Sequence, residues 1–574
     1  MMTNKATHKI IMRIMAAMIF TFHTISTMSQ TITANFSNDD SSKPYPKYEV
    51  RAMWLTTIGG IDWPHSYAKD TSPATIQKQQ QELRNILDKL KQANINTILL
   101  QTRVRATTIY PCDMEPWDGC LSGNSGTSPG YDALKYAIDE CHKRGMECHA
   151  WVVTIPIGKW NGAGCKNLRK THPELLRKIG EEGYMNPEHQ GTADYLARIC
   201  GDITRRYDID GIHLDYIRYP ETWTIRSSKG GKEGDLRNPD ARRNCITRIV
   251  KAIHNAVKSQ KPWVKMSCSP IGKYSDLTRY SSHGWNALNT VCQDAQAWLR
   301  DGLMDQLYPM MYFRDNQFFP FAIDWAESSY GKTIAPGLGI YFLDPREGKW
   351  QKDDVARQMQ VLRQLGLGHT YFRSDFFTRN VKDIYTYACN NIDNYPALVP
   401  PMTWAENRKP SPPQQINVTF ANITQLSWQG TSPYYNIYAS KEYPVDTDDP
   451  RNLIAQRVAR HSLDIETDKE YYYAVTAMDR YGNESLPTQS WQKARGNKQQ
   501  LLKNDGTTLL LPSHASLTDA GYVAIESLQG NLITTLPFNK NGINIQSLPE
   551  GAYCILTLGK KGITHKLGMF TIKR

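Results

Sequence analysis

The segment Asp210-Gly-Ile-His-Leu-Asp215-Tyr-Ile-Arg-Tyr-Pro220 is an apolar run that ends in a carboxylate, an arginine and a tyrosine. Its residues alternate with period two, so His213 and Asp215 share one face of a predicted strand, opposite Ile212 and Leu214. Two polar side chains on one strand face are costly to bury without partners. They therefore indicate either a satisfied structural network or a functional site.

The wider pattern places this segment in a repeating fold. Eight predicted strands alternate with helical patterns, at 49–57, 96–102, 147–153, 211–217, 264–269, 304–312, 334–340 and 369–373. The helical patterns cover 73–92, 130–144, 192–206, 239–260, 286–300, 319–328, 352–365 and 381–391. This rhythm predicts an α/β fold, a (β/α)8 TIM-type barrel over residues 48–398. A doubly wound open sheet is the alternative, but it usually has fewer units and a Gly-rich phosphate turn, which we do not find.

Two small all-β domains are expected after the barrel. A Pro-rich linker over 399–413 separates the barrel from residues 414–495, whose short strands resemble a fibronectin type III module. The stretch Tyr473-Ala-Val-Thr-Ala-Met-Asp-Arg-Tyr-Gly-Asn483 carries that resemblance. Residues 498–574 are predicted as a further β domain. The stretch Leu548-Pro-Glu-Gly-Ala-Tyr553 is similar to Bacteroidetes-type sorting domains, and a carbohydrate-binding module is the alternative.

The N-terminus has the layout of a signal peptide. Three basic residues precede the apolar run 14–20, and small and polar residues follow it. We expect cleavage after Ser29, which leaves an N-terminal segment over 30–47 before the barrel. No later segment is long and apolar enough to be expected to span a membrane. The sequence thus predicts an exported protein that is periplasmic, on the cell surface or secreted.

Composition excludes several classes of function. The chain has 40% hydrophobic and 22% charged residues, a soluble globular balance, and a formal net charge of +12 without a basic stripe, so no nucleic acid is expected. Among eleven cysteines, Cys112 and Cys120 flank a loop and are predicted to form a disulfide, with Cys165 as the alternative partner. There is no zinc-binding spacing, so neither a metal nor a cofactor is expected.

In a β/α barrel the reactive groups lie where strands end. The strand ends here offer carboxylates, arginines and aromatic rings, a combination that suits glycoside chemistry. Glycoside hydrolysis needs two carboxyl groups. Asp215 is the first, and Arg218 beside it favours its ionised form. The proton donor is then Asp315 or Glu115, although each could instead form a salt bridge to Arg314 or a loop-fixing hydrogen bond.

Aromatic rings can stack on sugar faces, and arginine can hold acidic or N-acyl substituents. We therefore expect further residues at the strand ends and in the following loops to bind substrate. They are Trp54, Arg103, Trp117, His149, Trp151, His213, Arg218, Tyr219 and Tyr312.

Five separated motifs occur in order along the barrel: Glu49-Val-Arg-Ala-Met-Trp-Leu-Thr-Thr57 with Ile61-Asp-Trp-Pro64, His149-Ala-Trp151, Asp210-Gly-Ile-His-Leu-Asp215 and Gln306-Leu-Tyr-Pro-Met-Met-Tyr312. Together they resemble the glycosyl-hydrolase-like family ten. The resemblance implies a β/α barrel that acts on glycans, with Asp215 in the active site. It also implies action on peptide-free peptidoglycan strands in bacterial envelopes. Many relatives carry a second acid directly after the equivalent of Asp215, where this chain has Tyr216.

The preferred hypothesis is an exported O-glycosyl hydrolase whose partner is a polysaccharide or a peptidoglycan glycan. The alternatives are a glycan-binding barrel without catalysis, and a lyase or transglycosylase on the same glycan.

Overall fold

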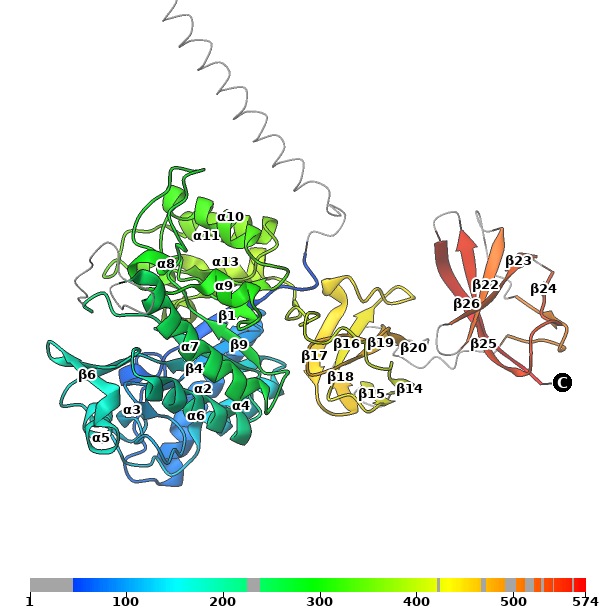
Figure 1. The fold of residues 1–574 in the computed structure, drawn as a ribbon. Helices are drawn as coiled ribbons and strands as arrows, with labels where there is room; N and C mark the ends of the chain where they lie inside the picture. Colours follow the sequence, from blue (N-terminus) through cyan, green and yellow to red (C-terminus); the bar gives the residue numbers. More distant parts are fainter. Residues whose placement is uncertain are drawn as a thin grey trace, which may run out of the picture.

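The computed structural model describes residues 45–223, 238–420, 424–465, 471–490, 502–511, 521–527, 531–539, 541–559 and 562–573. Three bodies follow one another in chain order: an α/β body, a β-sandwich and a smaller β domain (Figure 1). The predicted signal peptide and nearly all of segment 30–47 lie outside the described residues. Within the described residues, no helix has the length and apolar character that a membrane crossing requires.

The α/β body contains a parallel sheet in the order β11-β10-β9-β8-β4-β2-β1-β13-β12. The strands are β1 (Arg51–Leu55), β2 (Thr97–Val104), β4 (Glu147–Val153), β8 (Gly211–Asp215), β9 (Lys265–Cys268), β10 (Gln306–Leu307), β11 (Thr333–Ile334), β12 (Gly337–Leu338) and β13 (His369–Tyr371). A short antiparallel strand, β3 (Thr107–Thr108), pairs with β2.

The two ends of this sheet belong to one interrupted strand. β11 pairs with β10, and β12, only two residues further on, pairs with β13. A parallel bridge between Met310 and Gly337 joins the β10 segment to β12. The sheet therefore curls round on itself, and the predicted (β/α)8 barrel is confirmed.

Helices cover the outside of the barrel. They are α2 (Pro73–Gln92), α4 (Ala133–Lys143), α6 (Gln190–Arg206), α7 (Pro239–Lys258), α8 (Ala287–Thr290), α9 (Ala295–Arg300), α10 (Phe319–Glu327), α11 (Lys352–Gln364), α12 (Ser374–Thr378) and α13 (Ile384–Tyr387). In α2, Ser72 caps the first turn, and Leu83, Leu87 and Leu90 are buried at helical spacing.

Two predicted helices are wrong in part. Residues 286–300 form the separate helices α8 and α9, because Cys292 between them has φ 59°, which a right-handed helix cannot accommodate. Residues 381–391 form a sequence of short turns around α13, and Lys382 also has a positive φ. Long loops add α3 (Gly119–Ser122), α5 (Ala163–Thr171) and the antiparallel strands β5 (Pro156–Lys159), β6 (Leu176–Ile179) and β7 (Glu182–Met185).

The β-sandwich consists of two antiparallel sheets, ordered β14-β15-β18 and β17-β16-β19-β20. The strands are β14 (Gln414–Phe420), β15 (Thr424–Gln429), β16 (Tyr434–Ser440), β17 (Leu453–Val458), β18 (Ser462–Ile465), β19 (Tyr472–Met478) and β20 (Thr488–Ser490). Leu426, Tyr435 and Val475 are in its core. The resemblance to a fibronectin type III module stays a prediction.

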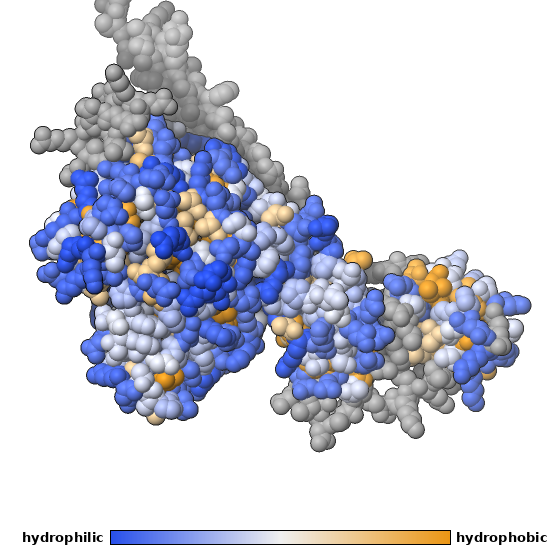
Figure 2. Space-filling model, turned by 60° about the horizontal axis from the view of Figure 1, so that its bottom comes forward, coloured by the Kyte–Doolittle hydropathy of each residue, from blue (hydrophilic) through white to orange (hydrophobic). Residues whose placement is uncertain are grey.

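The smaller C-terminal domain is also all-β. Its sheets are β21-β24 and β23-β22-β25-β26. The strands are β21 (Thr508–Leu509), β22 (Tyr522–Ser527), β23 (Leu532–Pro537), β24 (Ile543–Asn544), β25 (Gly551–Gly559) and β26 (Gly562–Ile572). On the face drawn in Figure 2, hydrophilic residues cover most of the barrel and the sandwich, and apolar residues form small groups between them.

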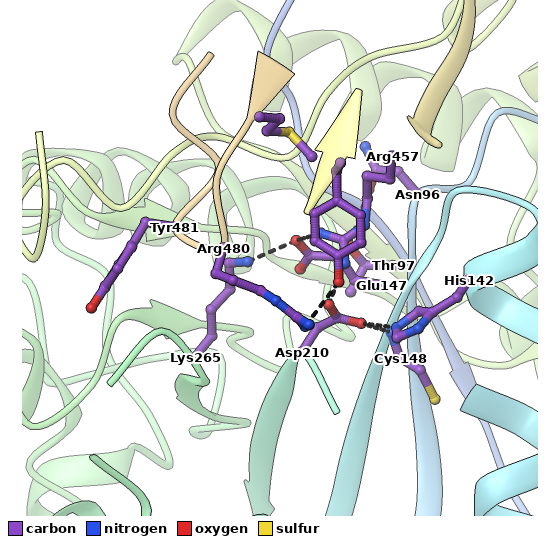
Figure 3. A network of polar contacts seen from close by, with 12 residues as sticks. Asn96, Thr97, His142, Glu147, Cys148, Asp210, Lys265, Arg457, Arg480 and Tyr481 are labelled. Atoms are coloured by element: carbon purple, nitrogen blue, oxygen red, sulfur yellow. Dashed lines mark hydrogen bonds and ion pairs between the residues drawn. The ribbon is translucent and has the colours of Figure 1, made fainter. Parts of the chain in front are cut away.

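The sandwich closes the end of the barrel at which the strands begin. Arg457, on β17, donates hydrogen bonds to Glu147, the first residue of β4, and to Asp210, which directly precedes β8 (Figure 3). Lys265, the first residue of β9, lies 2.7 Å from Glu147. The predicted linker is also attached to the barrel, because the indole of Trp404 donates to Asp305 at 3.0 Å. The strand ends that carry Asp215 therefore lie at the opposite end of the barrel from the sandwich.

Candidate active site

Asp215 is the last residue of β8, and three donors orient its carboxyl group. The hydroxyl of Ser269 and the backbone N–H of Tyr216 donate to Oδ1 at 2.7 and 2.8 Å. The indole of Trp151 donates to Oδ2 at 3.1 Å. Asp215 is only 5% exposed. Both oxygens are thus fixed in position at the carboxyl end of the central barrel strand.

The proton affinity of Asp215 differs from the sequence-based expectation. Burial raises the pKa of Asp215 above the ordinary carboxyl value, and the donors from Ser269, Tyr216 and Trp151, together with the charge of Arg218, offset this only in part. Arg218 lowers the pKa of Asp215 as expected, but burial has the larger effect, and the ionised form of Asp215 stays a prediction. A buried carboxyl with a raised pKa is suited to donating a proton.

His213 lies one layer deeper in the barrel and is neutral. An indole can only donate, so the hydrogen bond from Trp54 Nε1 to His213 Nε2, at 3.2 Å, requires an unprotonated Nε2. The proton is then on Nδ1, which lies 3.0 Å from the hydroxyl of Ser267. Burial and the nearby His149 hold the pKa of His213 well below its usual range. Both ring nitrogens are occupied, which makes His213 a support for Trp54 and corrects its predicted contact with substrate.

Aromatic rings surround Trp54 at the centre of the barrel. Its ring centroid lies 5.8 Å from that of Phe372, 6.3 Å from that of Tyr308 and 6.5 Å from that of Tyr312. A Cβ atom at Gly337 would lie 2.8 Å from the Trp54 ring, so β12 needs glycine there. Burial raises the pKa of Tyr312 well above its usual value, and the charge of Asp215 acts in the same direction. The structure thus brings Trp54, Trp151 and Tyr312 into one cluster that reaches Asp215 through Trp151, and their contact with substrate stays a prediction.

Arg103 and Glu115 form a closed pair away from this cluster. The register of β2 against β4 shifts between Gln101 and Arg103, so that Arg103 pairs with Val152 rather than with a residue of the inward face. Its guanidinium lies 2.6 Å from Glu115, and both side chains are completely buried. The hydroxyl of Tyr195, on α6, donates to the same carboxylate. Glu115 is therefore held in a structural ion pair, and its assignment as a proton donor and that of Arg103 as a substrate ligand are corrected.

The other predicted donor, Asp315, is exposed on the loop after β10 and has φ 53°. Its neighbour Arg314 forms an ion pair with Asp354 at 3.2 Å. The alternative prediction, a salt bridge between Asp315 and Arg314, is therefore wrong for the described structure. Trp117 is half-buried and packs against the main hydrophobic core.

His149 and Tyr219 are also placed differently from the expectation. His149 is completely buried, and its Nε2 lies 3.0 Å from Glu147. It pairs with Gly211 at the start of β8, whereas Asp215 pairs with Val153 at the end of β4. His149 therefore lies near the strand starts. Tyr219 is buried in the core beyond β8 and packs edge-on against Trp223.

Three residues near Asp215 were absent from the predicted set. Ser269 could have been found, because it shares the alternating face of Ser267 at the end of β9. The sequence draws attention to Tyr216 only because many relatives have an acidic residue at that position. Trp285, which lies within 5.6 Å of the Arg218 guanidinium, carried no signal because a long loop separates it from β9.

Two other predicted features concern cysteines and metals. All eleven cysteines lie within the described residues and are free thiols, so the predicted disulfide of Cys112 is wrong.

In the described part of the chain, Glu49, His369 and Asp393 are the one group close enough to hold a metal ion. Arg51 and Arg363 both pair with Glu49 and Asp393. Two guanidinium charges at the same carboxylates fit a structural ion-pair network and not a cation site.

A (β/α)8 barrel with an oriented, buried carboxyl group among aromatic rings at its strand ends is an arrangement that glycosidases use. Comparison with known families agrees: the family described as glycosyl hydrolase-like 10 matches residues 49–342. The chain belongs to this family.

Individual relatives are also named as glycosyl hydrolases. Glycosyl hydrolase YngK of Bacillus subtilis is 27% identical over 478 residues, which cover 76% of this chain and 92% of that protein. Glycosyl hydrolase DigH of Escherichia coli K12 is 28% identical over 302 residues, 48% of this chain and 67% of that protein. Among solved structures, the PgaB (BpsB) glycoside hydrolase domain of Bordetella bronchiseptica aligns with a TM-score of 0.42 at 15% identity, over 59% of this chain and 98% of that one.

Proposed function

We propose that this chain is an exported glycoside hydrolase in which Asp215 protonates the leaving oxygen of a glycosidic bond. The substrate is an amino-sugar glycan of the bacterial envelope, and peptide-free peptidoglycan strands are the first candidate. Family membership supports the reaction class. The single observation that carries the role of Asp215 is its position, a buried carboxyl group at the end of β8 that Trp151, Ser269 and the backbone of Tyr216 hold in one orientation.

The contacts of Asp215 explain how it could act as an acid. At neutral pH an ordinary aspartate is ionised and has no proton to give. Burial works against the charge on Asp215, while the three donors prevent rotation of the carboxyl plane. A proton on this group would thus be held in one direction, as general acid catalysis requires. Hydrolysis also needs a second group that activates water or attacks the sugar.

Binding without cleavage is the second candidate. It is favoured by the positions of the two acids that were predicted to complement Asp215. Glu115 is committed to Arg103 in a fully buried pair, and Asp315 is exposed on a loop. Neither makes a hydrogen bond to Asp215 or to its donors in the described structure.

The deciding experiment measures new reducing ends from peptide-free peptidoglycan with the chain from residue 30 onward. We expect release by the unchanged protein and loss of at least 100-fold in Asp215→Asn, about the contribution of one general acid. Asp315→Asn is the matched control, because it removes an exposed carboxylate from the loop after β10, two strands away from β8. Full activity of Asp215→Asn would exclude the proposed role. Binding of the glycan by the unchanged protein with no product would establish the second candidate.

A further inference from the structure

Two exposed aromatic side chains, Tyr216 and Trp285, contact Arg218, three residues after Asp215. Tyr216 is 41% exposed and Trp285 is 42% exposed. Tyr216 directly follows Asp215, and Trp285 ends the long loop that begins at Ser269 after β9. Large apolar groups left in water next to a polar site commonly mark a binding surface.

One buried cation holds both rings. The Arg218 guanidinium carbon lies 4.7 Å from the Tyr216 ring centroid and 5.6 Å from that of Trp285. Arg218 is itself 5% exposed and donates to Glu221 at 2.7 Å. The guanidinium therefore supports the two rings from the protein side and is not open to a ligand. Rings fixed in this way lose little conformational freedom when something binds to them.

The backbone of Tyr216 is a second, independent observation. Tyr216 has φ 51°, a conformation that bulky residues rarely adopt. In that conformation its N–H donates to Asp215 Oδ1. Glycine would adopt the same backbone without strain, and it would keep this donor. A tyrosine at a strained position, with its ring partly exposed, is the kind of local cost that functional sites retain.

We propose that Tyr216 and Trp285 form a stacking subsite for one pyranose ring of the glycan, adjacent to the bond that Asp215 protonates. The subsite rests on the proposed function for its ligand class. The C–H face of a pyranose is apolar and packs on aromatic faces, while its hydroxyl groups stay in water. Arg218 is a positioning residue for the two rings. Tyr216 directly follows Asp215 in the chain, and burial together with the charge of Asp215 raises the pKa of Tyr216, so a sugar stacked on this ring lies close to the carboxyl group.

The test is calorimetric titration with chitotetraose in the Asp215→Asn background, in which turnover does not interfere. Asparagine keeps an oxygen for the Tyr216 N–H. We expect Tyr216→Ala and Trp285→Ala each to weaken binding about tenfold, as loss of one aromatic contact implies. Tyr216→Phe should bind within about twofold of the reference, because it keeps the stacking face. Tyr330→Ala is the control, since it removes an exposed ring from the barrel just before β11, at the end opposite to Asp215.

Tyr216→Gly separates binding from backbone strain. It should raise the melting temperature, because it relieves the positive φ, and still lose the same tenfold in affinity. Unchanged affinity in both alanine variants would overturn the subsite while leaving the proposed function standing, since turnover of peptide-free peptidoglycan reports on that separately. Failure of the Asp215→Asn reference to bind chitotetraose would also overturn the subsite.

Discussion

The indole Nε1 of Trp151 donates a hydrogen bond to Oδ2 of Asp215 across two neighbouring barrel strands, at 3.1 Å. This contact favours the charged form of a carboxyl group whose burial favours the neutral form. The pKa of Asp215 reflects burial on one side and the donors from Ser269, Tyr216 and Trp151 with the charge of Arg218 on the other. A substitution of Trp151 can therefore change the pKa of Asp215 without changing the carboxyl group itself.

Trp151→Phe should raise the pKa of Asp215 further. The variant keeps a ring in the same place but removes the donor, so the ionised form loses a hydrogen bond worth about 1.5 kcal/mol, or about one pKa unit. The alkaline limb of the rate–pH profile should then move up by about one unit. An alkaline limb that stays in place would show that Asp215 is not the group whose proton the rate reports.

Asp215→Asn should remove activity and reduce the dependence of stability on pH. The pKa of Asp215 is raised in the folded state, so its stabilising effect is complete below the ordinary pKa of about 4 and is lost as pH rises through the folded value. Asparagine stays neutral throughout. Melting curves of the variant should therefore depend less on pH above about pH 4 than those of the unchanged protein. A variant whose melting temperature depends on pH above about pH 4 as strongly as that of the unchanged protein would contradict this assignment.

Arg457→Ala should weaken the junction between the sandwich and the barrel. Burial alone would raise the pKa of Glu147, but the charges of Lys265 and Arg457 and a hydrogen bond from His149 lower it to about 2. Burial likewise opposes ionisation of Asp210, and Arg457 and His142 hold its pKa well below the usual range. Removing Arg457 leaves two buried carboxylates without their shared partner, at a cost of about 3–5 kcal/mol in the free energy of unfolding.

Arg480→Ala is the matched control for that junction. Arg480 also reaches from the sandwich to a barrel aspartate, Asp208, but its side chain is 34% exposed. We expect a loss below about 1 kcal/mol in urea titration. Because the pKa values of Glu147 and Asp210 are lowered, their stabilisation is present above their ordinary pKa values and is lost as pH falls below about 4. In Arg457→Ala, stability should therefore fall less as the pH drops below about 4. In Arg480→Ala, the fall should be the same as in the unchanged protein.

Glu115→Gln distinguishes a structural acid from a catalytic one. The substitution leaves the Arg103 charge buried beside a neutral amide, which should cost about 3 kcal/mol or more of stability. The folded protein should keep its turnover number, because the pair lies on the helix side of β2. Circular dichroism melting and turnover at a temperature below the transition give the two values. A stable but inactive variant would return Glu115 to the list of candidate proton donors.

Much of the fold could be predicted because periodicity is a local property. The β4 and α2 boundaries agree with their predicted ranges, 147–153 and 73–92. The predictions are wrong where a single residue departs from regular helix or strand geometry. Cys292 splits a predicted helix by its positive φ, and a register shift after Gln101 turns Arg103 out of the barrel. Alternation of polar and apolar residues does not record such irregularities.

The candidate site was predicted less completely than the fold. Trp54 and Trp151 reach the cluster around Asp215 because strand alternation places them on the inward face. His149 is on the same face and yet lies near the strand starts, since depth along a strand depends on how neighbouring strands are staggered. Trp285 approaches Arg218 through a loop whose path no periodic pattern describes.

The sequence by itself determined that Asp215 ends an inward-facing strand of a β/α barrel, because strand order and alternation are written along the chain. Only the tertiary structure decided what that carboxyl group can do. Its pKa depends on solvent exclusion by residues from other strands and on donors such as Trp151 and Ser269, which are 64 and 54 positions away. Arg218, its neighbour in sequence, predicts the opposite sign, since a nearby charge is visible in the sequence and burial is not.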